Sequence, residues 1–138
     1  MPEPIETVIA FDYGAKRIGV AVGQTLSNTA EPLSVVTQKQ NKINWPAIEK
    51  IIAEWRPNRL VVGFPATHDG QSISIHDAID RFVRALEKRF SLPIELCDER
   101  LSSFEAAQQE MRSRHALDAV AAQIILQTWL NARRLQEN

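Results

Sequence analysis

The chain has 138 residues, of which 44% are hydrophobic and 24% are charged, which is the composition of an ordinary globular protein. Its 16 basic and 17 acidic residues give a net charge of −1, so it lacks the strong positive field typical of a non-specific nucleic-acid binder. This length suits one domain, and we expect residues 1–138 to fold as a single unit around its own core.

The ends and the cysteine content favour a cytoplasmic protein. No apolar run approaches the roughly 18 residues of a membrane span, and the opening MPEPIET lacks the basic start and apolar stretch of a signal peptide. The single cysteine, Cys97, cannot form an internal disulfide, which is consistent with a reducing compartment. We therefore expect no membrane partner.

The N-terminal part of the chain predicts three strands and a helix. Residues 7–11 and 18–23 are β-prone and are joined by the turn sequence DYGAKR, which is the pattern of a hairpin. A third extended segment over 31–37 completes a meander. Apolar residues at spacings of three and four then predict a helix that begins after its cap, Asn44, and ends before Pro57.

The remaining segments alternate between strands and helices. A continuous apolar strand over 59–65 precedes a helical pattern over 74–90, and a strand over 92–97 follows. Ser102 with Glu105 has the spacing of a capping box and predicts a helix over 102–112, before a final helix over roughly 116–135. This order predicts an α/β fold, in which helices cover a mixed sheet whose later strands run parallel to the first.

Carboxylates from remote parts of the chain are expected to meet at one edge of this sheet. Asp12 ends the first strand, Asp98 and Glu99 end the last, and Asp118 falls in the first turn of the final helix. Strand alternation allows only one of Asp98 and Glu99 to face the site, and spacing does not decide which. Carboxylates so close together would repel, and two divalent ions, Mg²⁺ or Mn²⁺, would relieve the repulsion and make a site for phosphodiester hydrolysis.

Each acid also has a purely structural interpretation. Asp12 could pair with Lys16 or Arg17, Asp98 could turn the chain into the next helix, and Asp118 could be favoured by the helix dipole. Together the three are harder to explain in this way, because a sheet edge and an apolar helix face are both expensive places for an unpaired charge.

Four ordered motifs carry a resemblance to a known family. FDYGAKRIGVAVG near the start, VVGFP with DG in the middle, DERLSSFEA, and DAVAAQIIL near the end resemble the YqgF family, also called RuvX, of bacterial proteins. That family belongs to the ribonuclease H-like superfamily, which includes Holliday junction resolvases. The resemblance implies a ribonuclease H-like fold with a five-stranded mixed sheet flanked by helices, and a nuclease site with two metal ions.

The resemblance also assigns roles to particular residues. It implies that Asp12, Glu99 and Asp118 are the catalytic, metal-binding carboxylates, with Asp12 shared by both ions, and so it selects Glu99 over Asp98. Three basic residues lie in the matching motifs and are expected to contact phosphate by charge rather than by base readout: Lys16, Arg17 and Arg100.

The implied function is processing of the 5′ end of pre-16S rRNA, with ribosomal particles as further partners. The alternative within the family is Holliday junction resolution, which calls for a two-fold dimer, and no stretch of this sequence indicates a dimer interface. That absence and the modest net charge favour RNA. Two further alternatives are a non-catalytic RNA-binding assembly factor and an actin-like ATPase, although the ATPase needs two such domains.

One segment departs from the family pattern. The family commonly has a longer loop with glycine and lysine before the final aspartate, whereas QQEMRSRHALD is short and has neither. Arg112, Arg114 and His115 either replace the missing basic charge or form only a helix connection. His68 and His115 are expected to be solvated more often than catalytic, and the three tryptophans are expected to pack in the core or an interface rather than stack on bases: Trp45, Trp55 and Trp129.

Overall fold

The computed structural model describes residues 5–14, 16–40, 42–64, 73–98 and 114–137. The elements in chain order are β1 (Thr7–Tyr13), β2 (Arg17–Gln24), β3 (Thr29–Lys39), β4 (Lys42–Ile43), α1 (Trp45–Trp55), β5 (Arg59–Phe64), α2 (Ile73–Phe90), β6 (Ile94–Asp98) and α4 (Arg114–Glu137). The predicted capping box and the helix over 102–112 lie outside the described residues.

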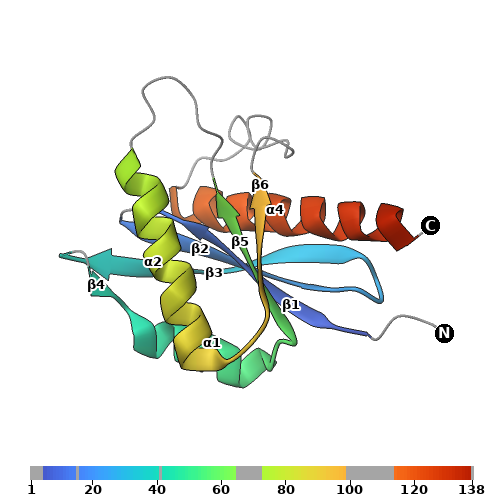
Figure 1. Cartoon of the computed structure of the whole chain (residues 1–138), viewed down its shortest axis with the longest axis horizontal. Coiled ribbons are helices and arrows are strands. Elements are labelled where there is room, and N and C mark those ends of the chain that lie inside the picture. Colours follow the sequence, from blue (N-terminus) through green and yellow to red (C-terminus); the bar gives the residue numbers. More distant parts are fainter. Residues whose placement is uncertain (1–4, 15, 41, 65–72, 99–113, 138) are drawn as a thin grey trace.

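The strands form one mixed sheet in the order β4-β3-β2-β1-β5-β6 (Figure 1). The meander strands pair antiparallel, whereas β5 runs parallel to both β1 and β6. The predicted α/β class and strand directions are therefore confirmed. The one difference is the sixth strand, β4, which has two residues and is too short to carry a periodic signal in the sequence.

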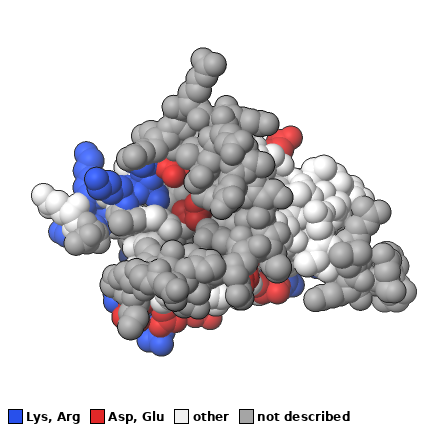
Figure 2. Space-filling model, turned by 90° about the horizontal axis from the view of Figure 1, so that it is seen from above, with Lys and Arg blue, Asp and Glu red and all other residues white. Residues whose placement is uncertain are grey.

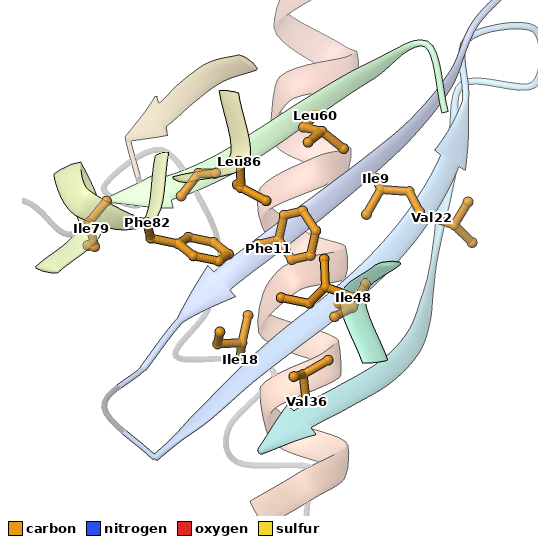
Figure 3. Packing of buried hydrophobic residues seen from close by; sticks show 12 residues of the cluster. Ile9, Phe11, Ile18, Val22, Val36, Ile48, Leu60, Ile79, Phe82 and Leu86 are labelled. Carbon is orange, nitrogen blue, oxygen red and sulfur yellow. The ribbon is translucent and has the colours of Figure 1, made fainter. Parts of the chain in front are cut away.

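Helices cover both faces of the sheet (Figure 1). The helices α1 and α2 lie over one face, where apolar side chains of alternate strand positions form the larger core cluster (Figure 3). Phe11 lies at its centre, edge-on to Phe82 of α2 with 5.5 Å between the ring centroids. The other face packs against α4 through a second cluster, which includes Val8, Ala10 and Leu126.

The α4 face of the sheet is lined by small residues, so the helix lies close to the strands. Ala10, Ala21 and Ala30 are buried against it. Two glutamines of α4 also bond to the backbone of the β2–β3 hairpin. The side chain of Gln123 donates to the Ala30 carbonyl at 3.0 Å, and that of Gln127 donates to the Asn28 carbonyl at 2.8 Å. Apolar packing and these two hydrogen bonds therefore both hold α4 against the sheet.

The ends of α1 follow the prediction. The side chain of Asn44 accepts a hydrogen bond from the Ala47 backbone amide at 3.3 Å, and Arg56 adopts a left-handed conformation with φ of 47° just before Pro57. Among the helices of the described part of the chain, none is long and apolar enough to cross a membrane.

The tryptophans divide between core and surface. Trp45 stacks on Phe82 with 5.9 Å between centroids, and Trp129 of α4 is buried in the cluster between that helix and the sheet, as expected for packing residues. Trp55 was expected on the apolar stripe of α1, but it is 39% exposed, because it occupies the last turn of the helix. Trp55 therefore does not lie in the core, and its expected packing in an interface stays a prediction.

Candidate active site

Asp12 lies on the α4 face of the sheet, at the carboxyl end of β1. Its neighbours Phe11 and Tyr13 pack on the α1 and α2 face, and side chains alternate along a strand. Its partners in the two adjoining strands are both glycines, Gly19 in β2 and Gly63 in β5. The half-buried carboxylate of Asp12 is therefore flanked within the sheet by residues without side chains.

Gly19 brings Asp118 to the same place. A Cβ atom on Gly19 would lie 1.9 Å from the Asp118 carbonyl oxygen, so the backbone of α4 rests directly on β2 at this point. Since Gly19 is paired with Asp12, Asp12 and Asp118 belong to one face and one end of the sheet. The signal for this contact was present in the sequence, because a glycine inside a strand often marks the close approach of another backbone.

Asp118 occupies a different helical position from the one expected. It is the fifth residue of α4, and the first turn of that helix contains no acidic residue. The prediction that it lies in the first turn is wrong, because α4 begins at Arg114, before the expected start at Ala116. The stabilising effect of the helix dipole falls off beyond the first turn. The helix dipole therefore does not explain why an acidic residue occupies position 118.

Arg17 is the bonding partner of Asp118. The Nε of Arg17 donates to Oδ2 of Asp118 at 2.6 Å, and the two side chains are only 22% and 25% exposed. The guanidinium therefore lies at the candidate site, at the start of β2. Lys16 is exposed in the turn before it, and its carbonyl accepts a hydrogen bond from the Gln38 amide at 2.8 Å.

The structure separates Asp98 from this face. Cys97 belongs to the cluster under α4 and its thiol bonds to the Ile125 carbonyl at 3.7 Å. Asp98 is the next residue of β6 and is paired with Phe64, which packs on the opposite face. Alternation therefore directs the side chain of Asp98 towards the α2 side, away from the face of Asp12 and Asp118.

Other predicted site residues lie outside the described residues. These are Glu99, Arg100, His68 and Arg112, together with the side chains of Arg114 and His115. Among the residues that the structure describes, no three His, Cys, Asp or Glu side chains are grouped closely enough to hold a metal ion. Viewed from above, Figure 2 shows acidic side chains near the middle of the molecule and a cluster of basic side chains to their left.

The family model of RuvX, described as a Holliday junction resolvase, matches residues 6–132. A protein of Hydrogenovibrio crunogenus named "Putative pre-16S rRNA nuclease" is 41% identical over 133 residues, covering 96% of this chain and 99% of that protein. A protein of Paraburkholderia xenovorans with the same name is 46% identical over 129 residues, covering 91% and 88%.

The fold is similar to that of a solved protein bound to a Holliday junction substrate. The structure of Thermus thermophilus RuvC in complex with a Holliday junction substrate has a TM-score of 0.59 at 17% identity, covering 93% of this chain and 96% of that one. At this identity the likeness concerns the fold alone. The chain thus has the ribonuclease H-like fold and belongs to the RuvX family, a family of nucleases that act on the phosphodiester bonds of nucleic acid.

Proposed function

We propose that this protein, as one domain, is a metal-dependent nuclease that processes the 5′ end of pre-16S rRNA. The observation that carries the proposal is the position of Asp12 and Asp118 on one face, at the carboxyl end of β1. In open α/β sheets this is the edge where ligands bind. The names of the curated relatives supply the RNA substrate.

The donor chemistry of the site fits divalent cations. Carboxylate oxygens are the ligands that Mg²⁺ and Mn²⁺ prefer, and Gly19 beside Asp12 lets α4 approach the sheet so that Asp118 lies on the same face as Asp12. Two such ions would activate water for attack on the phosphodiester and stabilise the charge on the leaving oxygen.

In this proposal the carboxylates of Asp12, Glu99 and Asp118 hold the two ions, with Asp12 shared between them. The side-chain direction of Asp98 supports the choice of Glu99, because it takes the Asp98 carboxylate away from the face of Asp12 and Asp118. The expected phosphate contacts are made by charge: Lys16, Arg17 and Arg100.

Resolution of Holliday junctions is the second candidate, and two findings favour it. The family model is described as a junction resolvase, and the chain shares the fold of the Thermus thermophilus RuvC resolvase. We place it second because the relatives at 41% and 46% identity carry the rRNA name, and because the chain has a net charge of only −1.

The test is cleavage of a 5′-extended pre-16S RNA fragment beside a four-way DNA junction, with Mg²⁺ and with Mn²⁺. We expect the native protein to cut the RNA, and Asp12→Asn to reduce the rate by about 10³-fold or more while RNA binding persists. Asp77→Asn, at an exposed position of α2, is the matched control and should cut at the native rate.

The outcomes separate the candidates. Junction cleavage without RNA cleavage would favour the resolvase. Tight RNA binding without cleavage of either substrate would favour a non-catalytic assembly factor, and an active Asp12→Asn variant would remove Asp12 from the catalytic set.

A further inference from the structure

The β3–β4 hairpin forms a projection beside the candidate site. β3 continues past its pairing with β2 and turns through Gln40, which has φ of 52°, into β4. Gln38 connects the hairpin to the β1–β2 turn through two hydrogen bonds. Its amide donates to the Lys16 carbonyl at 2.8 Å and its side chain donates to the Gly14 carbonyl. The hairpin therefore has a fixed position relative to Arg17, which follows that turn.

Two lysines of the hairpin lie on the same face of the sheet as the site. Val36 and Ile43 pack into the core under α1 and α2, so alternation directs Lys39 and Lys42 to the opposite face. That face also carries Arg17 and Asp118. Lys39 lies two residues along β3 from Thr37, the partner of Arg17, which is a distance of about 7 Å along the strand.

The two lysines repel each other across the ladder, and a bound anion would relieve that repulsion. Lys39 and Lys42 are directly opposite each other in the ladder, both are exposed, and like charges in such a pair are destabilising. Neither takes part in any ion pair within the described residues. The sequence has no acidic residue between Glu31 and Glu49 that could compensate them.

The surrounding charges point to a polyanion. At the left of Figure 2, on the side where Figure 1 places the β3–β4 hairpin, basic side chains gather to the left of the acidic ones near the middle of the molecule. Two neighbouring cations are enough to bind a small anion. Here the basic residues extend further, from Lys42 and Lys39 towards Lys16 and Arg17. An extended chain of phosphates matches that spread, since nucleic-acid backbones place successive charges a few ångströms apart.

We propose that Lys39 and Lys42 form a binding surface for the RNA strand that flanks the cleaved bond. This inference rests on the proposed function and extends it. The scissile phosphate lies at the carboxylates, and the neighbouring nucleotides run across β2 and β3 to the hairpin. The lysines contact phosphate and read no base, so the surface sets affinity and direction of the strand rather than sequence.

The test is binding of the 5′-extended pre-16S RNA fragment, labelled with a fluorophore and followed by anisotropy in EDTA over a range of salt concentrations. For the double variant Lys39→Gln, Lys42→Gln we expect Kd to rise about 10- to 30-fold at 0.1 M salt. The slope of log K against log salt should become shallower by about 1.4, as for two lost contacts with a single strand.

The matched control is Lys50→Gln, Lys88→Gln, which removes the same charge from exposed positions of α1 and α2 on the other face. It should keep the native Kd and slope. Removal of the opposed lysines should leave the melting temperature at or above that of the native protein, which verifies that the double variant folds.

An unchanged Kd and slope in the hairpin variant, or an equal loss in the control, would overturn the inference. Cleavage by the native protein is measured in parallel and separates this failure from that of the proposed function. If the native protein cuts the RNA while the hairpin variant binds normally, only the surface is wrong. If the native protein neither binds nor cuts it, both proposals fall.

Discussion

Arg17 holds an acidic side chain that the proposed metal site also needs. Its 2.6 Å bond to Asp118 is charge-assisted, and little of either side chain is exposed to solvent. The bond fixes the position of the Asp118 side chain beside the guanidinium. In the proposed site a divalent cation would have to share that carboxylate with the guanidinium, so we expect Arg17 to lower the affinity for metal and to stabilise the fold.

Substitution of Arg17 by Gln should therefore have opposite effects on folding and on metal binding. We expect the metal-free protein to lose about 1–2 kcal/mol of unfolding free energy, between the values for exposed and buried ion pairs. Mn²⁺ should bind about tenfold more tightly, because removal of one nearby positive charge is worth on the order of 1–2 kcal/mol at a partly exposed site.

The measurements for Arg17→Gln are urea unfolding in EDTA and Mn²⁺ titration by calorimetry. Arg81→Gln, an exposed position of α2, is the control and should change neither quantity. Weaker Mn²⁺ binding by Arg17→Gln would contradict the expectation and would mean that Arg17 orients Asp118 for the metal.

Among the elements, the contact of α4 with β2 is the one that assembles the site. Gly19 allows it because any side chain there would meet the Asp118 backbone rather than a flexible group. Gly63 differs, since its added Cβ would lie 2.4 Å from Cδ1 of Ile125, the end of a side chain that can change its rotamer. The two glycines flank Asp12, yet they should respond differently to the same substitution.

Gly19→Ala should push α4 away from β2. We expect a loss of about 3 kcal/mol of unfolding free energy, at the upper end for overpacking, because backbone cannot move aside as a side chain can. Asp118 moves with the helix, so RNA cleavage should fall even at temperatures where the variant is folded. Thermal melting and cleavage below the melting temperature measure the two effects, and a variant that melts and cleaves as the native protein does would refute the close contact.

Gly63→Ala should be milder and should be relieved by a second change. We expect a loss of about 1–2 kcal/mol, which falls when Ile125→Val removes the Cδ1 atom from the clash. A double-mutant cycle of urea unfolding measures this coupling. Ile125→Val combined with Gly19→Ala is the control and should give additive losses, because Ile125 is not among the nearest atoms to Gly19.

At the scale of the whole molecule, the sequence was sufficient for the order and direction of the described elements other than β4, but not for how their faces align. The apolar strand over 59–65 and the capped helix after Asn44 follow from local pattern, and both are confirmed. Local pattern left Asp98 and Glu99 undecided, the direction of the Asp98 side chain follows from the pairing of β6 with β5, and the partner of Arg17 lies 101 residues away. Such facts depend on tertiary register, which periodicity does not encode.

A network of ion pairs lies at the end of the sheet opposite to Asp12 and Asp118. Glu6, which is buried, bonds to Arg59 at the start of β5 at 3.2 Å and to Arg133 of α4 at 3.1 Å, and both guanidinium groups lie near the ring of Trp129. Burial lowers the pKa of Arg59, but Glu6 and Glu95 outweigh it and raise the pKa above the ordinary value. A basic group with a raised pKa contributes stability at every pH below its ordinary pKa, so this contribution persists through neutral and alkaline conditions.

Glu6→Ala should therefore destabilise the protein without changing its chemistry. Two partly buried arginines would lose their shared partner, and we expect a loss of about 2–4 kcal/mol in urea unfolding. Asp118 and Arg133 are about 22 Å apart along α4, so the native rate of RNA cleavage should persist at temperatures where the variant is folded. Glu49→Ala, which breaks an exposed pair with Arg89, is the control and should cost less than about 1 kcal/mol. Equal losses in the two variants would mean that Glu6 acts only as a surface charge, and a slower cleavage rate in Glu6→Ala would mean that the two ends of the sheet are coupled.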